Sequence, residues 1–414
     1  MKFKAEASKV YLFIEFTASA FFSMMFVTVS LYEATVAGLT PLQLVLVGTT
    51  LEISAFLFEI PTGVVADVYS RRLSIIIGYL LMGVGFLIEG LFPAFLPILL
   101  AQVVWGLGYT FTSGATQAWI SDEIGEEKAN RLFLRATRFG LVASLIGMGL
   151  AIFIGANNVA LPIIFGAIGV LMIGIVLFFI MPETGFKPTP QEERTNWQQM
   201  LHTFNEGMKA VKVRPRLITI LGVGFFYGLY SEGFDRLWVK HLLDNFEIPI
   251  LFGNNQVAFF AILRIIGAVL TIFAVQFVEK RVDSGSPLAI GRAMMIVTGL
   301  VAAAMIGFAF SPLLSLTLCL YLVIDTLRDV RTPLHTAWVN QKLDSETRAT
   351  IHSMSGQVDS IGQIAGGSSG LIARYLSVTA AIATSGLLLT PAMLLVSRAN
   401  SQSKDEAVAD SVEA

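Results

Sequence analysis

The stretch "YLVIDTLRDVRTPLHTAW", residues 321–338, combines acidic and basic side chains at helical spacing. Asp325, Arg328 and Asp329 fall at i, i+3 and i+4, so they share one helix face, which Thr332 continues at i+7. An arginine between two carboxylates can hold one of them ionised while the other accepts a proton or binds a cation. The alternative is an ion-pair cluster that only holds helices together. The cluster has a net negative charge, which needs a proton, a partner or a substrate.

A second charged stretch, "YGLYSEGFDRLWVKHLL" at residues 227–243, has a similar pattern. Glu232 and Arg236 stand at i and i+4, and Asp235 shares a polar stripe with Ser231. Such a stripe is typical of a cavity wall, although polar and aromatic stripes more often pack between helices. We therefore expect a second helix that places ionisable groups beside a cavity.

Membrane-spanning helices must position these groups, because the whole chain is unusually apolar. Hydrophobic residues make up 55% of the 414 residues, charged residues make up 14%, and the mean hydropathy is +0.71. A bilayer core needs about 20 apolar residues per helix. Segments of this kind recur twelve times, at residues 10–32, 42–66, 73–92, 96–118, 137–156, 159–181, 217–240, 256–278, 287–308, 312–335, 357–376 and 378–397. The sequence thus predicts an all-α integral membrane protein with twelve transmembrane helices.

Ionisable and polar side chains also interrupt other spans. Glu15 lies in the first span, and Gln102 and Tyr109 lie on a polar and aromatic face of the fourth. An ionisable group at the bilayer centre costs about 2.5–3.5 kcal/mol or more, so its presence indicates a function. The candidate residues for proton or substrate binding are Glu15, Gln102, Tyr109, Glu232, Asp235, Arg236, Asp325, Arg328 and Asp329.

Lysine and arginine residues gather on one side of the predicted spans. The joints on the other side, such as "EATVAGLTP", "FPAFLP" and "GANNVALP", contain neither residue. Cytoplasmic loops are enriched in Lys and Arg. We therefore expect a multi-pass protein of the plasma (inner) membrane with both termini in the cytoplasm.

A long polar segment divides the predicted spans into two sets of six. The expected organisation is an N-terminal half at 1–181, a cytoplasmic linker at 182–216, a C-terminal half at 217–397 and a cytoplasmic tail at 398–414. Residues 197–208 of the linker predict an amphipathic helix on the inner membrane surface. The halves are weakly similar, since "TQAWISDEIGEEKANR" after the fourth span resembles "HTAWVNQKLDSETRAT" after the tenth. Two related halves favour a transporter.

The stretch "FEIPTGVVADVYSRR", residues 58–72, ends an apolar span with an aspartate and two arginines. Gly63 would permit a close approach between helices. Asp67 offers an anion at the membrane boundary, where it can pair with Arg71 or Arg72. The arginines also fit a purely topological role as inside-facing charges, but an aspartate adds nothing to that signal.

These four residues match, in register, the loop signature of the major facilitator superfamily, Gly-x-x-x-Asp-Arg/Lys-x-Gly-Arg-Arg/Lys. The chain resembles that superfamily in this loop, in its span count and in its half-repeat, whereas Val68 and Ser70 depart from the signature. The resemblance implies two pseudo-symmetric six-helix halves, with the first, fourth, seventh and tenth spans around a central cavity. It also implies a gating role for Gly63, Asp67, Arg71 and Arg72, with a lock between the halves near residues 356–359.

The sequence as a whole predicts a secondary active transporter that works by alternating access. The candidate cavity holds five carboxylates and two arginines, a net charge of −3, which suits protons or organic cations. The first expectation is therefore proton-coupled efflux, by antiport, of small and partly hydrophobic compounds, cations included. Two features of drug antiporters are absent, because Gln102 stands where an arginine would precede Gly106 and the fifth span has no proline.

Two alternatives stay open. One is an importer of a nutrient or metabolite with the same fold. The other is a homologue that moves no such substrate, either a sensor or a protein that translocates lipid. A flux measurement in vesicles separates these alternatives from the first.

Other chemistry is not expected. The chain has no G-x-x-x-x-G-K-[ST] phosphate-binding motif, and none of its four histidines has a second ligand at helical spacing. We expect no enzyme activity, no cofactor and no metal site. The single cysteine, Cys319, excludes an intramolecular disulfide, and the net charge of −2 gives no indication of nucleic acid. The expected partners of a monomer are a small-molecule substrate, protons and the lipid bilayer.

Overall fold

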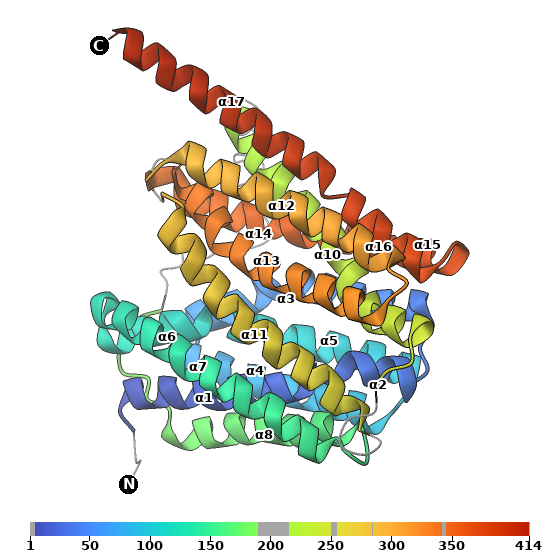
Figure 1. The fold of residues 1–414 in the computed structure, drawn as a ribbon. Coiled ribbons are helices and arrows are strands. Elements are labelled where there is room, and N and C mark those ends of the chain that lie inside the picture. Colours follow the sequence, from blue (N-terminus) through green and yellow to red (C-terminus); the bar gives the residue numbers. More distant parts are fainter. Residues whose placement is uncertain (1–4, 189–214, 250–254, 284, 342–344, 414) are drawn as a thin grey trace. The chain divides into compact units, whose positions relative to one another are not determined.

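The computed structural model describes residues 5–188, 215–249, 255–283, 285–341 and 345–413 (Figure 1). The regular structure within these ranges is α-helical. The predicted linker helix at 197–208 lies outside the described residues.

Eight helices form the first part of the chain. They are α1 (Ala7–Phe26), α2 (Val29–Thr35), α3 (Pro41–Val68), α4 (Arg71–Leu91), α5 (Phe95–Thr112), α6 (Ala115–Ile124), α7 (Glu126–Ile154) and α8 (Leu161–Ile180).

The described helices of the second part carry most of the charged candidates. They are α10 (Pro215–Asn245), α11 (Gln256–Arg281), α12 (Pro287–Phe310), α13 (Leu314–Gln341), α14 (Ser345–Gly366), α15 (Ser369–Tyr375), α16 (Val378–Leu387) and α17 (Thr390–Glu413).

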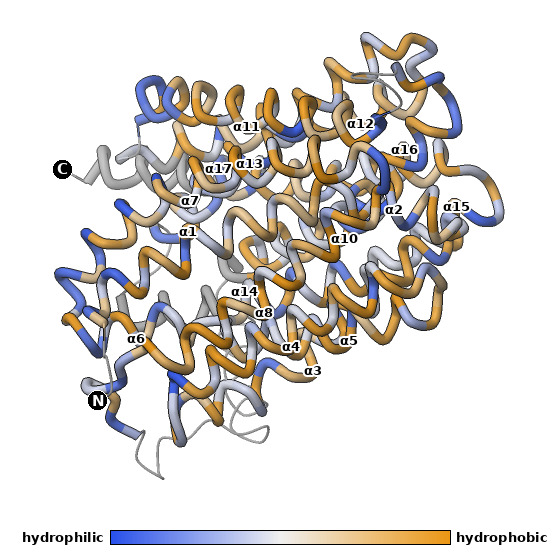
Figure 2. Tube along the Cα trace, turned by 90° about the horizontal axis from the view of Figure 1, so that it is seen from below, coloured by the Kyte–Doolittle hydropathy of each residue, from blue (hydrophilic) through white to orange (hydrophobic). Residues whose placement is uncertain are grey.

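These helices confirm the twelve predicted spans, because short breaks divide four of the spans in two: α1 with α2, α5 with α6, α14 with α15 and α16 with α17. Within the described residues, nine spans are long and apolar enough to cross a bilayer by composition alone. The charge-rich α10 and α13 are not among these nine. Hydrophobic residues run along the helices, and hydrophilic residues concentrate near helix ends and connections (Figure 2).

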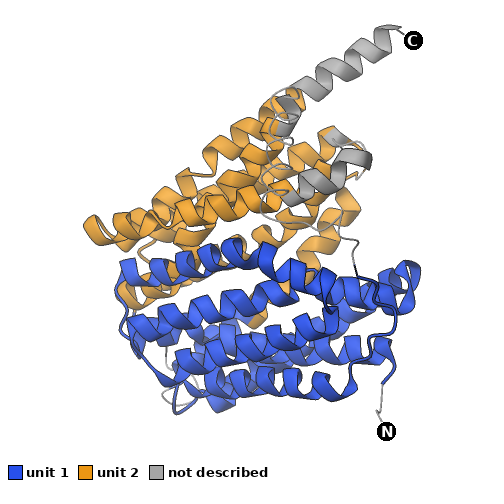
Figure 3. Cartoon of the chain, turned by 180° about the vertical axis from the view of Figure 1, so that it is seen from behind, with its two compact units in different colours: residues 1–200, 247–264 blue, residues 201–246, 265–414 orange. Residues whose placement is uncertain are grey.

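The chain forms two compact units (Figure 3). Unit 1 comprises residues 1–200 and 247–264, and unit 2 comprises residues 201–246 and 265–414. The start of α11 therefore groups with the N-terminal helices, a feature that hydropathy does not reveal. The boundaries given above for the two halves, the linker and the tail stay a prediction.

Helix starts follow local capping rules. The Thr40 side chain accepts from the Gln43 backbone N–H at 3.4 Å, and Gln43 Oε1 accepts from the Thr40 N–H at 2.9 Å. With Pro41 at the first helical position, this capping box fixes the start of α3. Ser70, Ser286 and Ser377 cap α4, α12 and α16 in the simpler way, through one side-chain oxygen.

Glycines allow close helix contacts within each unit. In unit 1, a Cβ at Gly147 of α7 would overlap the carbonyl oxygen of Ala20 on α1. In unit 2, a Cβ at Gly228 of α10 would overlap the carbonyl of Asp359 on α14. Small residues drive packing between membrane helices because they let backbones touch. A Cβ at Gly63 would meet no atom within 4 Å in this structure, so the close approach expected there stays a prediction.

The sequence repeat corresponds to buried tryptophans in both units. Trp119 in unit 1 and Trp338 in unit 2 are each only 1% exposed. The indole N–H of Trp119 donates to the Pro182 carbonyl at 2.7 Å. The indole N–H of Trp338 has no acceptor among the described residues. The halves thus share a buried tryptophan, but within the described residues only the indole of unit 1 has a hydrogen-bond acceptor.

The glycine contacts lead to a stability prediction. Gly147→Ala forces a methyl group against the backbone of α1 and should cost about 1–3 kcal/mol, because neither backbone can move freely. The midpoint of thermal unfolding in detergent should fall by several degrees. Gly149→Ala on the same helix is the matched control, since a Cβ there has open space. Equal midpoints for the two variants would contradict the packing described here.

Candidate functional site

The strongest charged contact in unit 2 joins α13 to α10. Arg328 donates to both carboxylate oxygens of Asp235, with 2.7 Å between Nη2 and Oδ2 and a still shorter contact between Nη1 and Oδ1. This bidentate geometry is the strongest form of ion pair in proteins. The Arg328 side chain is 21% exposed and that of Asp235 is 45% exposed. The pair is therefore fixed in geometry but still open to exchange with solvent.

Aromatic rings surround the guanidinium of Arg328. It lies 5.6 Å from the ring centroid of Tyr230 and 5.8 Å from that of Phe234. One turn further on, Trp238 of α10 stacks on Tyr321 of α13, with 4.3 Å between ring centroids. The pair therefore has an apolar and aromatic setting in which a flat organic molecule could be held.

The two carboxylates that flank Arg328 in sequence have other surroundings. Asp329 is exposed, and its Oδ2 accepts from Thr271 Oγ1 of α11 at 3.3 Å. Asp325 Oδ2 lies against Gly267 of α11, where any larger residue would collide with it. Asp325 also interacts electrostatically with Arg328, less strongly than Asp235 does. Sequence spacing placed Arg328 between the two aspartates of its own helix, whereas its closest partner lies on α10.

A second ion pair lies on α10 itself. Arg236 Nε is 3.2 Å from Glu232 Oε1, and the Glu232 side chain is only 4% exposed. The predicted i, i+4 pair thus forms. Removing one partner of a buried ion pair costs about 3–5 kcal/mol, because the other charge is left without compensation. This pair fits a structural role as well as it fits proton binding.

The unit 1 candidates do not form one cluster. Gln102 is 3% exposed, and its Nε2 donates to Glu89 Oε2 of α4 at 3.1 Å. Tyr109, two turns further along α5, is 48% exposed. Glu15 interacts with Tyr11, one turn earlier on α1. The polar face predicted for the fourth span is therefore divided between a buried contact and an exposed one.

Sequence reasoning missed the buried acids of unit 1. Glu89 is 1% exposed and Glu33 is 2% exposed. The Tyr32 hydroxyl donates to the Glu89 backbone carbonyl at 2.7 Å. A carboxylate inside the third predicted span was a signal that could have singled out Glu89, because ionisable groups within spans are rare.

The predicted gating residues lie on both sides of the short connection between α3 and α4, with Gly63 and Asp67 near the end of α3 and Arg71 and Arg72 at the start of α4. Arg71 makes a close ion pair with Asp122 of α6, and its Nη2 lies 3.9 Å from Asp67 Oδ1. Arg72 donates its backbone N–H to Glu183 Oε1 at 2.9 Å, and its guanidinium donates to the Phe178 carbonyl. The aspartate of the motif is thus the weaker partner of Arg71 in this structure.

Glu183 links the loop to the end of α8. Its Oε2 accepts from the Ser70 hydroxyl at 2.7 Å, while its Oε1 accepts from the N–H of Arg72. A carboxylate at the start of α4 satisfies free backbone donors there. Asp122 and Glu183 were not among the sequence candidates. Asp122 lies inside the repeated segment of unit 1, which was read as a repeat only.

A match to a protein-family model establishes the family of this chain. The model described as the Major Facilitator Superfamily matches residues 11–367. The chain belongs to the major facilitator superfamily. The matched range contains every candidate residue from Glu15 to Asp329. The superfamily assignment confirms the resemblance stated from the loop motif, while membership of a drug-efflux branch stays a prediction.

Similar proteins support this superfamily assignment. The uncharacterized MFS-type transporter YxaM of Bacillus subtilis (strain 168) is 25% identical over 367 residues, which cover 86% of this chain and 85% of the relative. The crystal structure of the nucleoside transporter NupG has a TM-score of 0.73 at 14% identity, covering 96% of this chain and 99% of that one. A bacterial homolog of the human lysosomal transporter Spinster gives 0.68 at 14% identity, with 96% of each chain covered. At such identities the solved structures show the fold alone.

Within this superfamily member, the loop contacts lead to a prediction about stability. Asp122→Asn should destabilise the protein by about 1–2 kcal/mol, because it removes the close ion pair of a mostly buried arginine. Asp67→Asn should cost less than about 1 kcal/mol, because its contact with Arg71 is longer and half exposed. Chemical unfolding of the two variants in detergent measures the difference. A larger loss for Asp67→Asn would show that Asp67 is the principal partner of Arg71.

Proposed function

We propose that this superfamily member is a proton-coupled secondary transporter that works by alternating access and exports small, partly hydrophobic compounds. The observation that supports the proposal best is the bidentate pair of Arg328 and Asp235, set among aromatic rings of α10. Charges inside the membrane are costly, so a pair that is kept there and half open to solvent has a use beyond packing.

The proposed coupling step is a change of partner for Arg328. When Asp235 takes up a proton, it loses its charge and can no longer balance the guanidinium. Asp325 lies within electrostatic range of the same arginine, one turn away on α13. Arg328 then pairs with Asp325, and the two pairings give α10 and α13 two alternative contacts. Such a two-state element is what a proton needs in order to bias a conformational equilibrium.

Export and uptake differ in the side from which the substrate binds, and the same residues serve either direction. We propose export because the residues around Arg328 are largely aromatic, which suits partly hydrophobic molecules that enter membranes by themselves. Uptake of a nutrient is the alternative. Flux measured with the protein inserted in a known orientation distinguishes the two.

The orientation of the chain is part of the proposal. We place a monomer in the plasma membrane with both termini in the cytoplasm, on the basis of the lysine and arginine asymmetry. Reporter fusions at the C-terminus and at residues 156–159 should then give opposite signals. Equal signals would contradict this orientation.

The coupling step predicts that Asp235→Asn uncouples the protein. Purified protein in proteoliposomes, with a pH gradient and a pH-sensitive dye inside, is screened with a panel of small aromatic compounds. At least one compound should move protons through the parental protein, and the same flux should fall about tenfold or more in the variant, because the amide cannot ionise. The control is Asp244→Asn, which removes the partner of Lys240 on the same helix. Undiminished proton flux in Asp235→Asn would overturn the coupling step.

A further inference from the structure

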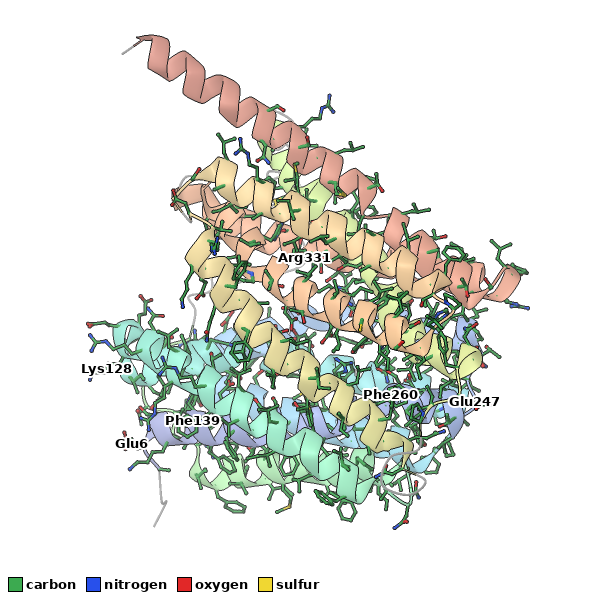
Figure 4. The ribbon with its side chains drawn as sticks, in the orientation of Figure 1. Glu6, Lys128, Phe139, Glu247, Phe260 and Arg331 are labelled. Carbon is green, nitrogen blue, oxygen red and sulfur yellow. The ribbon has the colours of Figure 1, made fainter. Side chains whose placement is uncertain are left out.

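Besides Arg236 and Arg328, helices α10 and α13 carry a further arginine inside unit 2, Arg331. Arg331 lies on α13, three residues after Arg328 (Figure 4). It is half-buried, and its Nη1 is inaccessible to solvent and has no hydrogen-bond partner among the described residues. Arginine carries five N–H donors and no acceptor. A guanidinium inside a membrane protein with an unused donor is costly to keep unless something binds it.

Aromatic rings fix the plane of this guanidinium. Its central carbon lies 3.9 Å from the ring centroid of Tyr227 and 5.6 Å from that of Tyr230, both on α10. The Tyr227 hydroxyl is within 2.9 Å of Thr298 Oγ1 on α12, which fixes that ring in turn. Stacking orients the positive group and leaves its edge for hydrogen bonds, the arrangement that suits planar anions.

Further donors without partners lie around Arg331. Tyr230 is fully buried, and its hydroxyl has no partner among the described residues. His335 links the group to Trp338, with ring centroids 5.7 Å from Tyr227 and 6.1 Å from Trp338. The indole N–H of Trp338 has no acceptor in the described part either, and an indole can only donate. The hydroxyl of Tyr230 and the indole N–H of Trp338 can both donate hydrogen bonds, so a ligand that supplies acceptors would satisfy them.

Two carboxylates of α10 and α14 already have hydrogen-bond donors of their own. Asp359 on α14 interacts electrostatically with Arg331, but its Oδ2 accepts from Gln363 Nε2 at 2.8 Å. Asp235 is held at both oxygens by Arg328. Within the described residues, Arg331 thus has a partial counter-charge in Asp359 but forms no ion pair. A cation–π contact is worth about 2 kcal/mol when desolvated and does not replace the hydrogen bonds of a guanidinium.

We propose that Arg331, with Tyr227 and Tyr230, forms an anion-binding subsite that takes the carboxylate or phosphate group of an organic substrate. The inference rests on the proposed transport function and names the substrate class, an aromatic or otherwise flat molecule with an acidic group. The guanidinium edge and the Tyr230 hydroxyl hold the anion, and the aromatic rings hold the apolar body. The expectation of a cationic substrate was based on a set of charges that did not include Arg331.

Equilibrium binding tests this subsite without any proton gradient, so its outcome is independent of the proposed coupling. The full chain in detergent is mixed separately with three matched indole probes: the acid indole-3-acetate, its amide indole-3-acetamide and the amine tryptamine. Phenyl phosphate serves as a second acidic probe, with a phosphate in place of the carboxylate. The acidic probes should raise the midpoint of thermal unfolding by about 2 °C or more at concentrations well above their dissociation constants. The amide and the amine should raise it less.

Two variants assign the effect to Arg331. Arg331→Gln should abolish the response to the acidic probes, whereas the control Arg374→Gln should keep it. Arg374 also lies over a tyrosine, Tyr375, but is exposed at the end of α15. If Arg331→Gln fails to fold, Tyr230→Phe should weaken the apparent affinity for the acids at least twofold. The subsite is refuted if no acid stabilises the parental protein, if the amine is preferred, or if these variants keep the parental response.

Discussion

A charge held inside apolar helices must find an opposite charge or a set of hydrogen bonds, and this constraint organises unit 2. Asp235 forms an ion pair with Arg328, and Glu232 forms one with Arg236. The close packing of α10 on α14, made possible by Gly228, brings further polar groups toward the same helix. The pair of Asp235 and Arg328 is the one that joins two helices and stays half open to solvent. Its breakage would change how these helices contact each other.

Unit 1 uses its charges differently. Arg71, Asp122 and Glu183 lie at helix ends, where they connect α4 to α6 and to the segment after α8. The pair of Arg71 and Asp122 is mostly buried, with side chains 17% and 29% exposed, so it should stabilise the unit more than an exposed ion pair would. Deep inside the unit, Gln102 Nε2 donates to Glu89 Oε2. Unit 1 therefore has its network of charged side chains near helix ends, whereas unit 2 has charged pairs within its helices.

The sequence predicted the helices well because apolar length is a strong local signal, and spacing correctly placed Glu232 beside Arg236. It could not predict that Arg328 pairs with Asp235, because that contact joins helices far apart in the chain. The partner of Gln102 was missed although Glu89 lies only 13 residues away, because the sequence prediction took no account of ionisable groups in the third span. The close helix approach predicted at Gly63 from the motif stays a prediction, because a Cβ there has open space in this structure.

The central claim is that Asp235 takes up the coupled proton. Infrared difference spectroscopy of the reconstituted protein measures this directly, because a protonated carboxyl has a C=O stretching band that a carboxylate lacks. Acidification protonates other carboxylates as well, so the signal of Asp235 is the component of this band, with its matching carboxylate loss, that the parental protein gives and Asp235→Asn lacks. An unchanged spectrum on acidification, or the same band in the variant, would contradict the account.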